Sequence, residues 1–188
     1  MSLQTTTWQT VGPFFSIGLN HLNTVEIAPT GTPGQRLTVE GCVIDGNGEP
    51  VPDAVIEIWQ ADAEGQFVVS ADAVLEPTLS VFTGFGRVPT EDDGRFRFTT
   101  VRPGPVPGPG GRVQSPHLAV RVMMRGLLRD LVTRMYFPCE TIGSDPVLQT
   151  VPEHRRHTLI ATQDSDEQGT FLWNIELQGE RETVFFDC

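Results

Sequence analysis

The chain has 188 residues, of which 38% are hydrophobic and 20% are charged, as in an ordinary folded domain. One hydrophobic core suffices at this length, because chains usually divide into domains only well beyond about 200 residues. Thirteen basic residues, all of them Arg, oppose 24 acidic ones, and the net charge of -11 disfavours nucleic acid and anionic membranes as partners.

Cysteine spacing and the N-terminal sequence indicate the cellular compartment. Cys42, Cys139 and Cys188 are far apart and form no CxxC pair, so we expect neither a disulfide framework nor a zinc cluster. The first residues are polar, and no apolar run approaches the roughly 20 residues of a membrane span. We therefore expect a protein of the reducing cytoplasm without a membrane anchor.

Alternation of apolar and polar residues predicts a series of short strands. In the first half of the chain Trp59 ends one of them and is expected in the core. Pro152 to His157 is expected to open a short helical turn. The predicted strands cover residues 36–45, 55–59, 95–99, 117–123, 131–137, 157–162 and 171–177.

These strands, with turn signals between them and no long amphipathic helix, predict an all-β fold, an antiparallel β-sandwich over residues 36–188. Residues 1–35 show little alternation and are predicted to form an extended N-terminal arm that packs on a partner subunit. The PGPVPGPGG segment at 103–111 is predicted to be a surface loop, because Pro has no amide proton for a central ladder.

Residues that carry chemistry are few. Among four scattered histidines only His154 and His157 lie close together, and a solvated pair beside two Arg residues is favoured over a metal site. The sequence contains no GxSxG, GxxxxGK or HExxH motif, so hydrolase, nucleotide-binding and zinc-protease functions lack support.

Four longer phrases follow one another in a fixed order. They are VIEIWQADAEGQF from Val55, GFGRVPTEDDGRFRFTTVRPGPV from Gly84, SPHLAVRV from Ser115 and TRMYFP from Thr133. Together they resemble the intradiol ring-cleaving dioxygenases, β-sandwich enzymes that use a ferric ion to open catechols between the two hydroxyl-bearing carbons. The resemblance covers most of the chain.

In that family two tyrosinates and two histidines hold Fe(III), for which anionic phenolate oxygens are suitable ligands. Carried over by the resemblance, the four ligand positions fall at Phe67, Val106, His117 and Ala119, and only His117 retains a donor atom. The sole tyrosine, Tyr136, lies on a later strand. The resemblance therefore implies that this chain holds no metal and that His117 is structural.

The two ends of the chain narrow the family resemblance to one kind of subunit. WQTVGPF from Trp8 and GERETVFFDC at the C-terminus resemble the metal-free alpha subunits of two-subunit members, whose iron sits on a homologous beta subunit. By this resemblance Thr10, Gly12 and Pro13 line a substrate pocket at the boundary of the two subunits, and Arg134 faces the carboxylate of an aromatic substrate that reacts with O2. A higher oligomer of alpha-beta units is implied as well.

Two other interpretations stay open. One is a ligand-binding or scaffold β-sandwich domain without a catalytic role, and the other is an independent enzyme with a different metal site around His154 and His157. For single residues, Gly12-Pro13 has the alternative of a simple turn, and Arg134 that of a surface ion pair. Co-purification with a homologous chain that bears both Tyr and both His ligands separates these interpretations.

Overall fold

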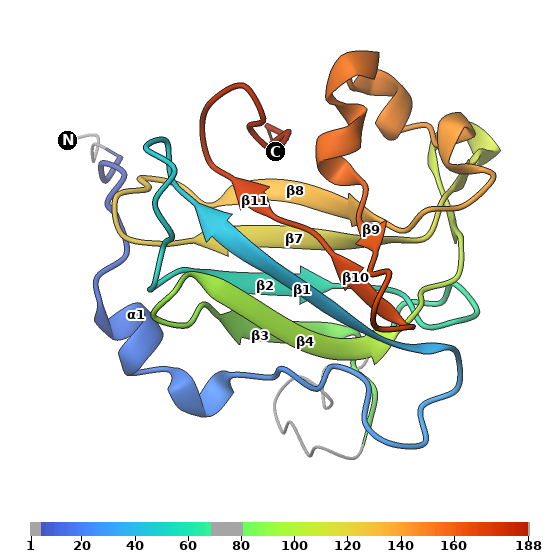
Figure 1. Ribbon diagram of the computed structural model, residues 1–188, viewed down its shortest axis with the longest axis horizontal. Helices are drawn as coiled ribbons and strands as arrows, with labels where there is room; N and C mark the ends of the chain where they lie inside the picture. The colour runs from blue at the N-terminus through green and yellow to red at the C-terminus, as the bar shows by residue number, and fades with distance from the viewer. Residues whose placement is uncertain (1–4, 69–80, 188) are drawn as a thin grey trace.

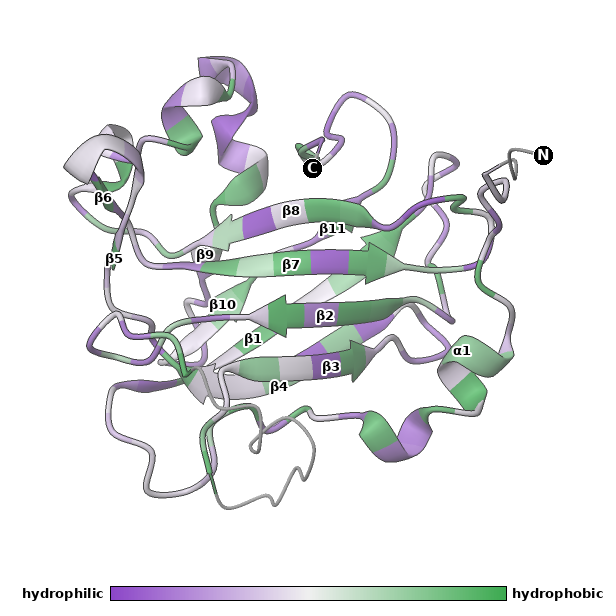
Figure 2. Cartoon of the chain, turned by 180° about the vertical axis from the view of Figure 1, so that it is seen from behind, coloured by the Kyte–Doolittle hydropathy of each residue, from purple (hydrophilic) through white to green (hydrophobic). Residues whose placement is uncertain are grey.

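Two β-sheets face each other in the computed structural model, which describes residues 5–68 and 81–187 (Figure 1). One sheet has four strands that pair antiparallel throughout, in the order β3-β2-β7-β8. These strands are β2 (Val55–Trp59), β3 (Phe85–Pro89), β7 (His117–Met123) and β8 (Leu131–Tyr136). They lie side by side and are seen from their outer side in Figure 2.

The second sheet is built around β1 (Arg36–Ile44), which pairs antiparallel with β4 and parallel with β10 and β11. The two parallel pairings depart from the purely antiparallel sheet that the alternation predicts. The remaining strands of this sheet are β4 (Arg95–Val101), β9 (Thr162–Gln163), β10 (Thr170–Leu172) and β11 (Ile175–Glu176).

A break at Trp173 and Asn174 divides the strand predicted at 171–177 into β10 and β11. Trp173 is buried in the core, and its backbone carbonyl presses against β1 at Gly41. A Cβ atom at Gly41 would lie 1.8 Å from that carbonyl oxygen, so only glycine fits this approach.

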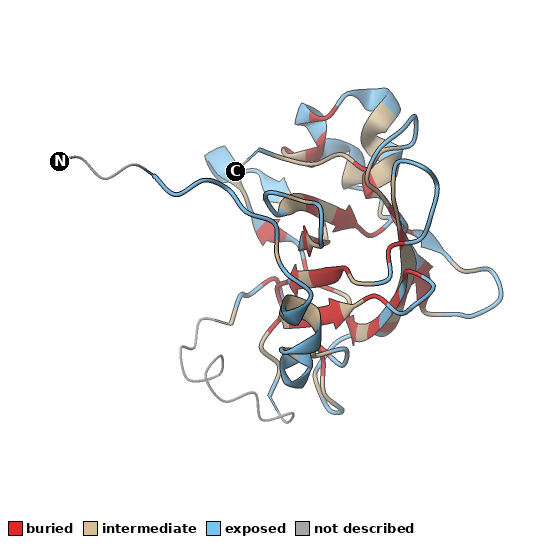
Figure 3. Cartoon of the chain, turned by 90° about the vertical axis from the view of Figure 1, so that its left-hand side faces the viewer, coloured by how far each residue is buried: buried red, intermediate tan, exposed pale blue. Residues whose placement is uncertain are grey.

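The hydrophobic core lies between the two sheets. Along β7, Leu118, Val120 and Val122 are buried and alternate with residues on the outer face, which is the pattern of a strand with one covered side. Figure 3 shows the buried residues between the layers. The opposite sheet contributes Leu37, Val39, Val43, Phe96, Phe98, Phe171, Trp173 and Ile175.

Short elements surround the sandwich. The Pro-rich segment at 103–111 stays outside both main sheets, as its prolines predict, and two of its residues pair in a small ribbon. It is not wholly a surface loop, because Pro103, Gly104 and Val106 are buried. These elements are α1 (Phe14–Ile17), β5 (Val106–Pro107), β6 (Val113–Gln114) and the 3₁₀ helices η1 (Asn20–Leu22), η2 (Pro109–Gly111), η3 (Ile142–Ser144), η4 (Leu148–Thr150) and η5 (Glu153–Leu159).

The predicted strand at 157–162 is wrong. Its first residues belong to η5, which confirms the helical turn expected from Pro152, and only Thr162 remains in a strand. Leu159, at the end of η5, is fully buried in a second apolar cluster with Tyr136, Leu148 and Val151. The helical turn places Leu159 in that cluster. Its burial there favours the helical turn over the strand that the short alternation predicts.

Residues 5–35 combine exposed and buried parts. Residues 5–10 are exposed at the start of the described chain (Figure 3), although the Trp8 ring lies against Arg129 and Thr10 bonds Gly126. Ile27 and Ala28 belong to the buried interior before β1 begins at Arg36. Packing of the arm on a partner subunit stays a prediction. Within the described part of the chain, no helix has the length and apolar character needed to cross a membrane.

Candidate functional site

The outer face of the four-stranded sheet carries a hollow of about 420 Å³. Strand register aligns Phe85, Trp59, Ala119 and Arg134 across the four strands. Trp59 is 40% exposed here, so the expectation that it lies in the core is wrong. On β2 the inward positions are taken by Ile56 and Ile58, and the alternation of the strand turns Trp59 outward.

At the β3 edge of this face, Arg87 contacts Phe15 of the N-terminal arm. Its Nη2 donates a hydrogen bond to the Phe15 carbonyl at 2.7 Å, and its guanidinium lies 4.6 Å from the centroid of the Phe15 ring. Nη1 pairs with Glu57 at 3.1 Å. Arg87 is only 3% exposed, so one buried cation holds both α1 and the neighbouring strand.

Thr10, Gly12 and Pro13, which the sequence predicts in the substrate pocket, lie beside the end of the four-stranded sheet where β7 turns into β8. The Thr10 hydroxyl accepts a hydrogen bond from the Gly126 amide, in the turn between β7 and β8, at 2.8 Å. The carbonyls of Gly12 and Pro13 accept from the amides of Phe15 and Ile17 and so start α1. The arm therefore passes from the β7–β8 turn to the outer edge of β3.

Arg134 lies on β8, at the opposite edge of the same face. Three strand spacings separate β8 from β3, or about 14 Å. The residues that line the hollow include neither Arg134 nor Thr10, Gly12 and Pro13, so the described chain alone does not bring the predicted pocket residues together. The Nη1 group of Arg134 donates to Gln114 Oε1 at 2.6 Å and approaches the Tyr136 hydroxyl at 3.5 Å.

The positions that the resemblance assigns to iron ligands do not form a ferric site. Phe67 is 43% exposed, Val106 is buried, and neither they nor Ala119 offers a donor atom. His117 is bonded to its own chain: because the Ser115 carbonyl only accepts, Nδ1 carries the proton of that 2.8 Å contact. The residues present do not fit the ion. No group of three or more His, Cys, Asp and Glu side chains that could hold a metal occurs among the described residues.

His117 is a buried imidazole that hydrogen-bonds within its own chain. Burial, with the positive charge of Arg134, lowers the pKa of His117 below its ordinary value of 6.5. Its ring lies against Tyr136, with 5.6 Å between the ring centroids.

Asp145 and Tyr136 form the part of the site that sequence reasoning missed. Asp145 is fully buried, and its Oδ1 accepts a hydrogen bond from the Tyr136 hydroxyl at 3.0 Å. Burial of the phenol raises the pKa of Tyr136, so the hydroxyl keeps its proton. A GSDP sequence reads as a turn, and nothing in it signals a carboxylate drawn into the interior.

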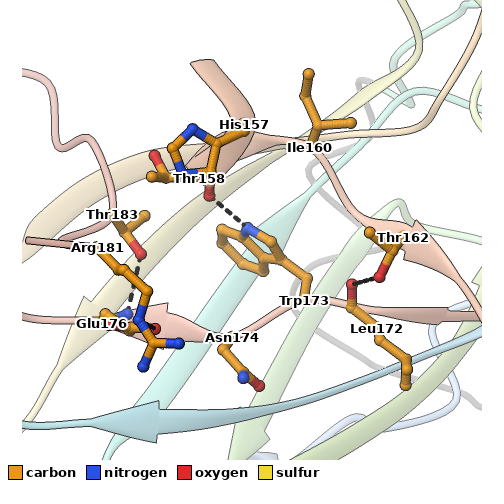
Figure 4. A pocket seen from close by; sticks show the side chains of 10 residues that line it. All are labelled: His157, Thr158, Ile160, Thr162, Leu172, Trp173, Asn174, Glu176, Arg181 and Thr183. Atoms are coloured by element: carbon orange, nitrogen blue, oxygen red, sulfur yellow. Dashed lines mark hydrogen bonds and ion pairs between the residues drawn. The ribbon is translucent and has the colours of Figure 1, made fainter. Parts of the chain in front are cut away.

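A second cleft of about 360 Å³ contains His157 (Figure 4). Its polar groups bind one another: Arg181 pairs with Glu176 at 3.2 Å, and the Trp173 indole N–H donates to the Thr158 carbonyl at 2.9 Å. His154 does not line this cleft, and no third His, Cys, Asp or Glu side chain of the described residues completes a metal site with the HxxH pair. The alternative of a metal enzyme centred there gains no support.

Comparisons with known proteins agree with this fold. A protein-family model described as Dioxygenase matches residues 10–179, and an intradiol ring-cleavage dioxygenase from Tetranychus urticae shares the fold, with a TM-score of 0.57 and 21% identity over 82% of this chain and 86% of that one. The chain belongs to the intradiol dioxygenase family.

Within that family the chain is 40% identical to the protocatechuate 3,4-dioxygenase alpha chain of Burkholderia cepacia, over 99% of this chain and 98% of the relative. It is 36% identical to the protocatechuate 3,4-dioxygenase beta chain of the same organism, over 88% of this chain and 74% of that one. The likeness to the alpha chain thus spans both proteins almost completely.

Proposed function

We propose that this chain is the metal-free alpha subunit of a protocatechuate 3,4-dioxygenase, and that a homologous beta subunit holds the Fe(III). The assembled enzyme cleaves protocatechuate with O2 to 3-carboxy-cis,cis-muconate. The observation that carries the proposal is the loss of donor atoms at Phe67, Val106 and Ala119 in a chain that is similar to alpha chains over nearly its whole length.

The outer face of the four-stranded sheet is the surface that we assign to the beta subunit. Its hollow is lined by the half-exposed rings of Trp59 and Phe85, and such rings are frequent at the centres of protein interfaces. We further propose a higher oligomer of alpha-beta units in the cytoplasm, where the free thiols of Cys42 and Cys139 are compatible with the reducing conditions.

Thr10, Gly12, Pro13 and Arg134 are the residues that we assign to the substrate pocket. Arg134 is in register with Ala119, which lines the hollow, and Thr10 bonds the turn that joins β7 to β8, which supports assigning both to one subunit boundary. Arginine suits an aromatic acid, because a bidentate pair with the carboxylate fixes the orientation of the ring as well as binding its charge.

Coexpression with a homologous chain that bears two Tyr and two His ligands tests the subunit assignment. Each chain alone should leave protocatechuate unchanged, and the purified complex should consume O2 and form 3-carboxy-cis,cis-muconate. Turnover by this chain alone, or a failure of the two chains to associate, contradicts the proposal.

Kinetics of Arg134→Ala in the assembled enzyme test the pocket. Losing the partner of a desolvated carboxylate typically costs about 2 to 5 kcal/mol, so kcat/KM for protocatechuate should fall at least 30-fold. Catechol, which lacks the carboxylate, should react as before. Equal losses on both substrates place Arg134 in the interface instead.

A further inference from the structure

We infer that Gln114 and Tyr136 are positioning residues that fix Arg134 and reserve its Nε–Nη2 edge for the carboxylate of an aromatic acid. The inference rests on the proposed function, because it deepens the role of Arg134 in substrate binding. It concerns residues on two different elements, Gln114 on β6 and Tyr136 on β8.

The hydrogen bonds of Arg134 indicate that Nη1 holds the side chain in place and that the Nε–Nη2 edge binds the substrate. Nη1 carries two protons, and its two recorded partners, Gln114 Oε1 and the Tyr136 hydroxyl, take both. Nε and Nη2 have no recorded hydrogen bond or ion pair with the described residues. These two groups form one edge of the planar guanidinium, and that edge matches a carboxylate bidentately.

Each partner of Nη1 is itself fixed. The Gln114 amide nitrogen donates to the Pro107 carbonyl at 2.9 Å, so its oxygen is the end presented to Arg134. Tyr136 has a single hydroxyl proton, which it gives to Asp145, and its oxygen therefore meets Arg134 as an acceptor.

Asp145 is the anchor of this chain of contacts. Its Oδ2 accepts from the Ser115 amide at 2.8 Å, and its Oδ1 accepts from the amides of Val147 and Leu148 at 2.9 and 2.8 Å, besides the tyrosine. A fully buried carboxylate with three backbone donors has one orientation, so the position of Arg134 is set by the main chain through two side chains.

The test compares Tyr136→Phe and Gln114→Leu in the assembled alpha-beta enzyme. Each change removes one acceptor of Arg134 Nη1, together with the bond that fixes that acceptor, and keeps most of the side-chain volume. The kcat/KM for protocatechuate should fall roughly three- to tenfold, through KM, as expected for one hydrogen bond to Arg134. Catechol kinetics should stay unchanged. The control is Gln163→Leu, at an exposed glutamine on β9, which should alter neither substrate.

A second arm of the experiment repeats both substitutions together with Arg134→Ala. If the two residues act only through Arg134, they cause no further loss of protocatechuate activity in that background. If the Tyr136→Phe chain does not assemble with the beta subunit, the Gln114→Leu variant alone tests the inference. Gln114 lies on a two-residue strand outside the two main sheets, so its substitution should leave the sandwich folded.

Failure of the inference and failure of the proposed function give different results. If Arg134→Ala selectively impairs protocatechuate while Tyr136→Phe and Gln114→Leu do not, the positioning role is wrong and the substrate role of Arg134 stands. If the losses add fully to that of Arg134→Ala, or affect catechol equally, the positioning role is also overturned. If Arg134→Ala itself is unselective, the pocket assignment fails.

Discussion

His117 binds the backbone of its own chain in the region where related enzymes are expected to hold iron. Its proton goes to the Ser115 carbonyl, and the neighbouring Tyr136 gives its proton to Asp145. A buried polar group without a metal needs such partners, because an unmade hydrogen bond in the interior costs about 1 to 3 kcal/mol. Because His117 is buried and hydrogen-bonded in the folded chain, its protonation should make the stability of the chain depend on pH.

His117 should make the chain less stable below pH 6.5. Its pKa in the folded chain is lowered by burial, so over the interval beneath 6.5 the unfolded chain binds a proton that the folded chain does not. The free energy of unfolding then falls with decreasing pH by at most about 1.4 kcal/mol per pH unit, and it gains nothing from this group above 6.5.

Urea unfolding at pH 7.5 and pH 5.5 checks the prediction. His117→Asn should lose less stability between the two pH values than the wild-type chain does. His157→Asn is the matched control, because the side chain of His157 is exposed. An identical pH dependence in His117→Asn and the control contradicts the assignment.

The short helix α1 depends on a contact made by one of its two phenylalanines. Phe15 stacks on the buried Arg87, whereas Phe14 is 77% exposed. A partly desolvated cation–π contact is worth about 1 kcal/mol, so Phe15→Leu should loosen α1 while the sandwich remains folded. Phe14→Leu is the control and should have no such effect.

Hydrogen–deuterium exchange measures that loosening at residues 12–18. In Phe15→Leu the amides of Ile17 and Gly18, which bond to the carbonyls of Pro13 and Phe14, should exchange several-fold faster than in the wild-type chain. Equal exchange in the two leucine variants means that Arg87 does not hold the arm through this ring.

At the scale of elements, alternation predicted the strands that have one covered side and missed those shaped by contacts from elsewhere. β7 is a clear case, with Leu118, Val120 and Val122 inside. β3 was missed because a glycine and a proline interrupt its short pattern, and the 157–162 segment was mistaken because burial of Leu159 depends on Tyr136, a residue far away in sequence.

Some residues of the candidate site could likewise be predicted from the sequence, and others could not. Phrases in the sequence indicated His117 and Arg134, since each lies in a recognisable motif. Gln114 and Asp145 carry no motif, and only the fold brings them to Arg134 and Tyr136. Long-range contacts of this kind depend on sheet register and loop geometry, which alternation does not encode.

At the scale of the whole molecule, we expect the arm and the outer sheet face to form one interface with the beta subunit. The side chains of residues 5–10 are exposed to solvent, and Phe15 is bonded to Arg87 at the edge of the face proposed for the beta subunit. An obligate interface buries about 2,000 Å² or more, and we expect the exposed arm to add to the area of the sheet face.

Deletion of residues 1–15 should therefore impair assembly with the beta chain or raise KM for protocatechuate. The sandwich should stay folded, because its buried interior begins at Ile27. Size-exclusion chromatography and steady-state kinetics check the two effects, and circular dichroism checks the fold. Assembly and turnover like those of the full chain contradict a role for the arm.

Iron stoichiometry tests the central claim most directly. We expect elemental analysis to find no stoichiometric iron in the purified chain, because Phe67, Val106 and Ala119 supply no ligand atoms, and one iron per alpha-beta pair in the complex. The isolated chain should also lack the visible tyrosinate-to-iron absorption band. One tightly bound iron per isolated chain with that band, or two irons per pair, contradicts the account.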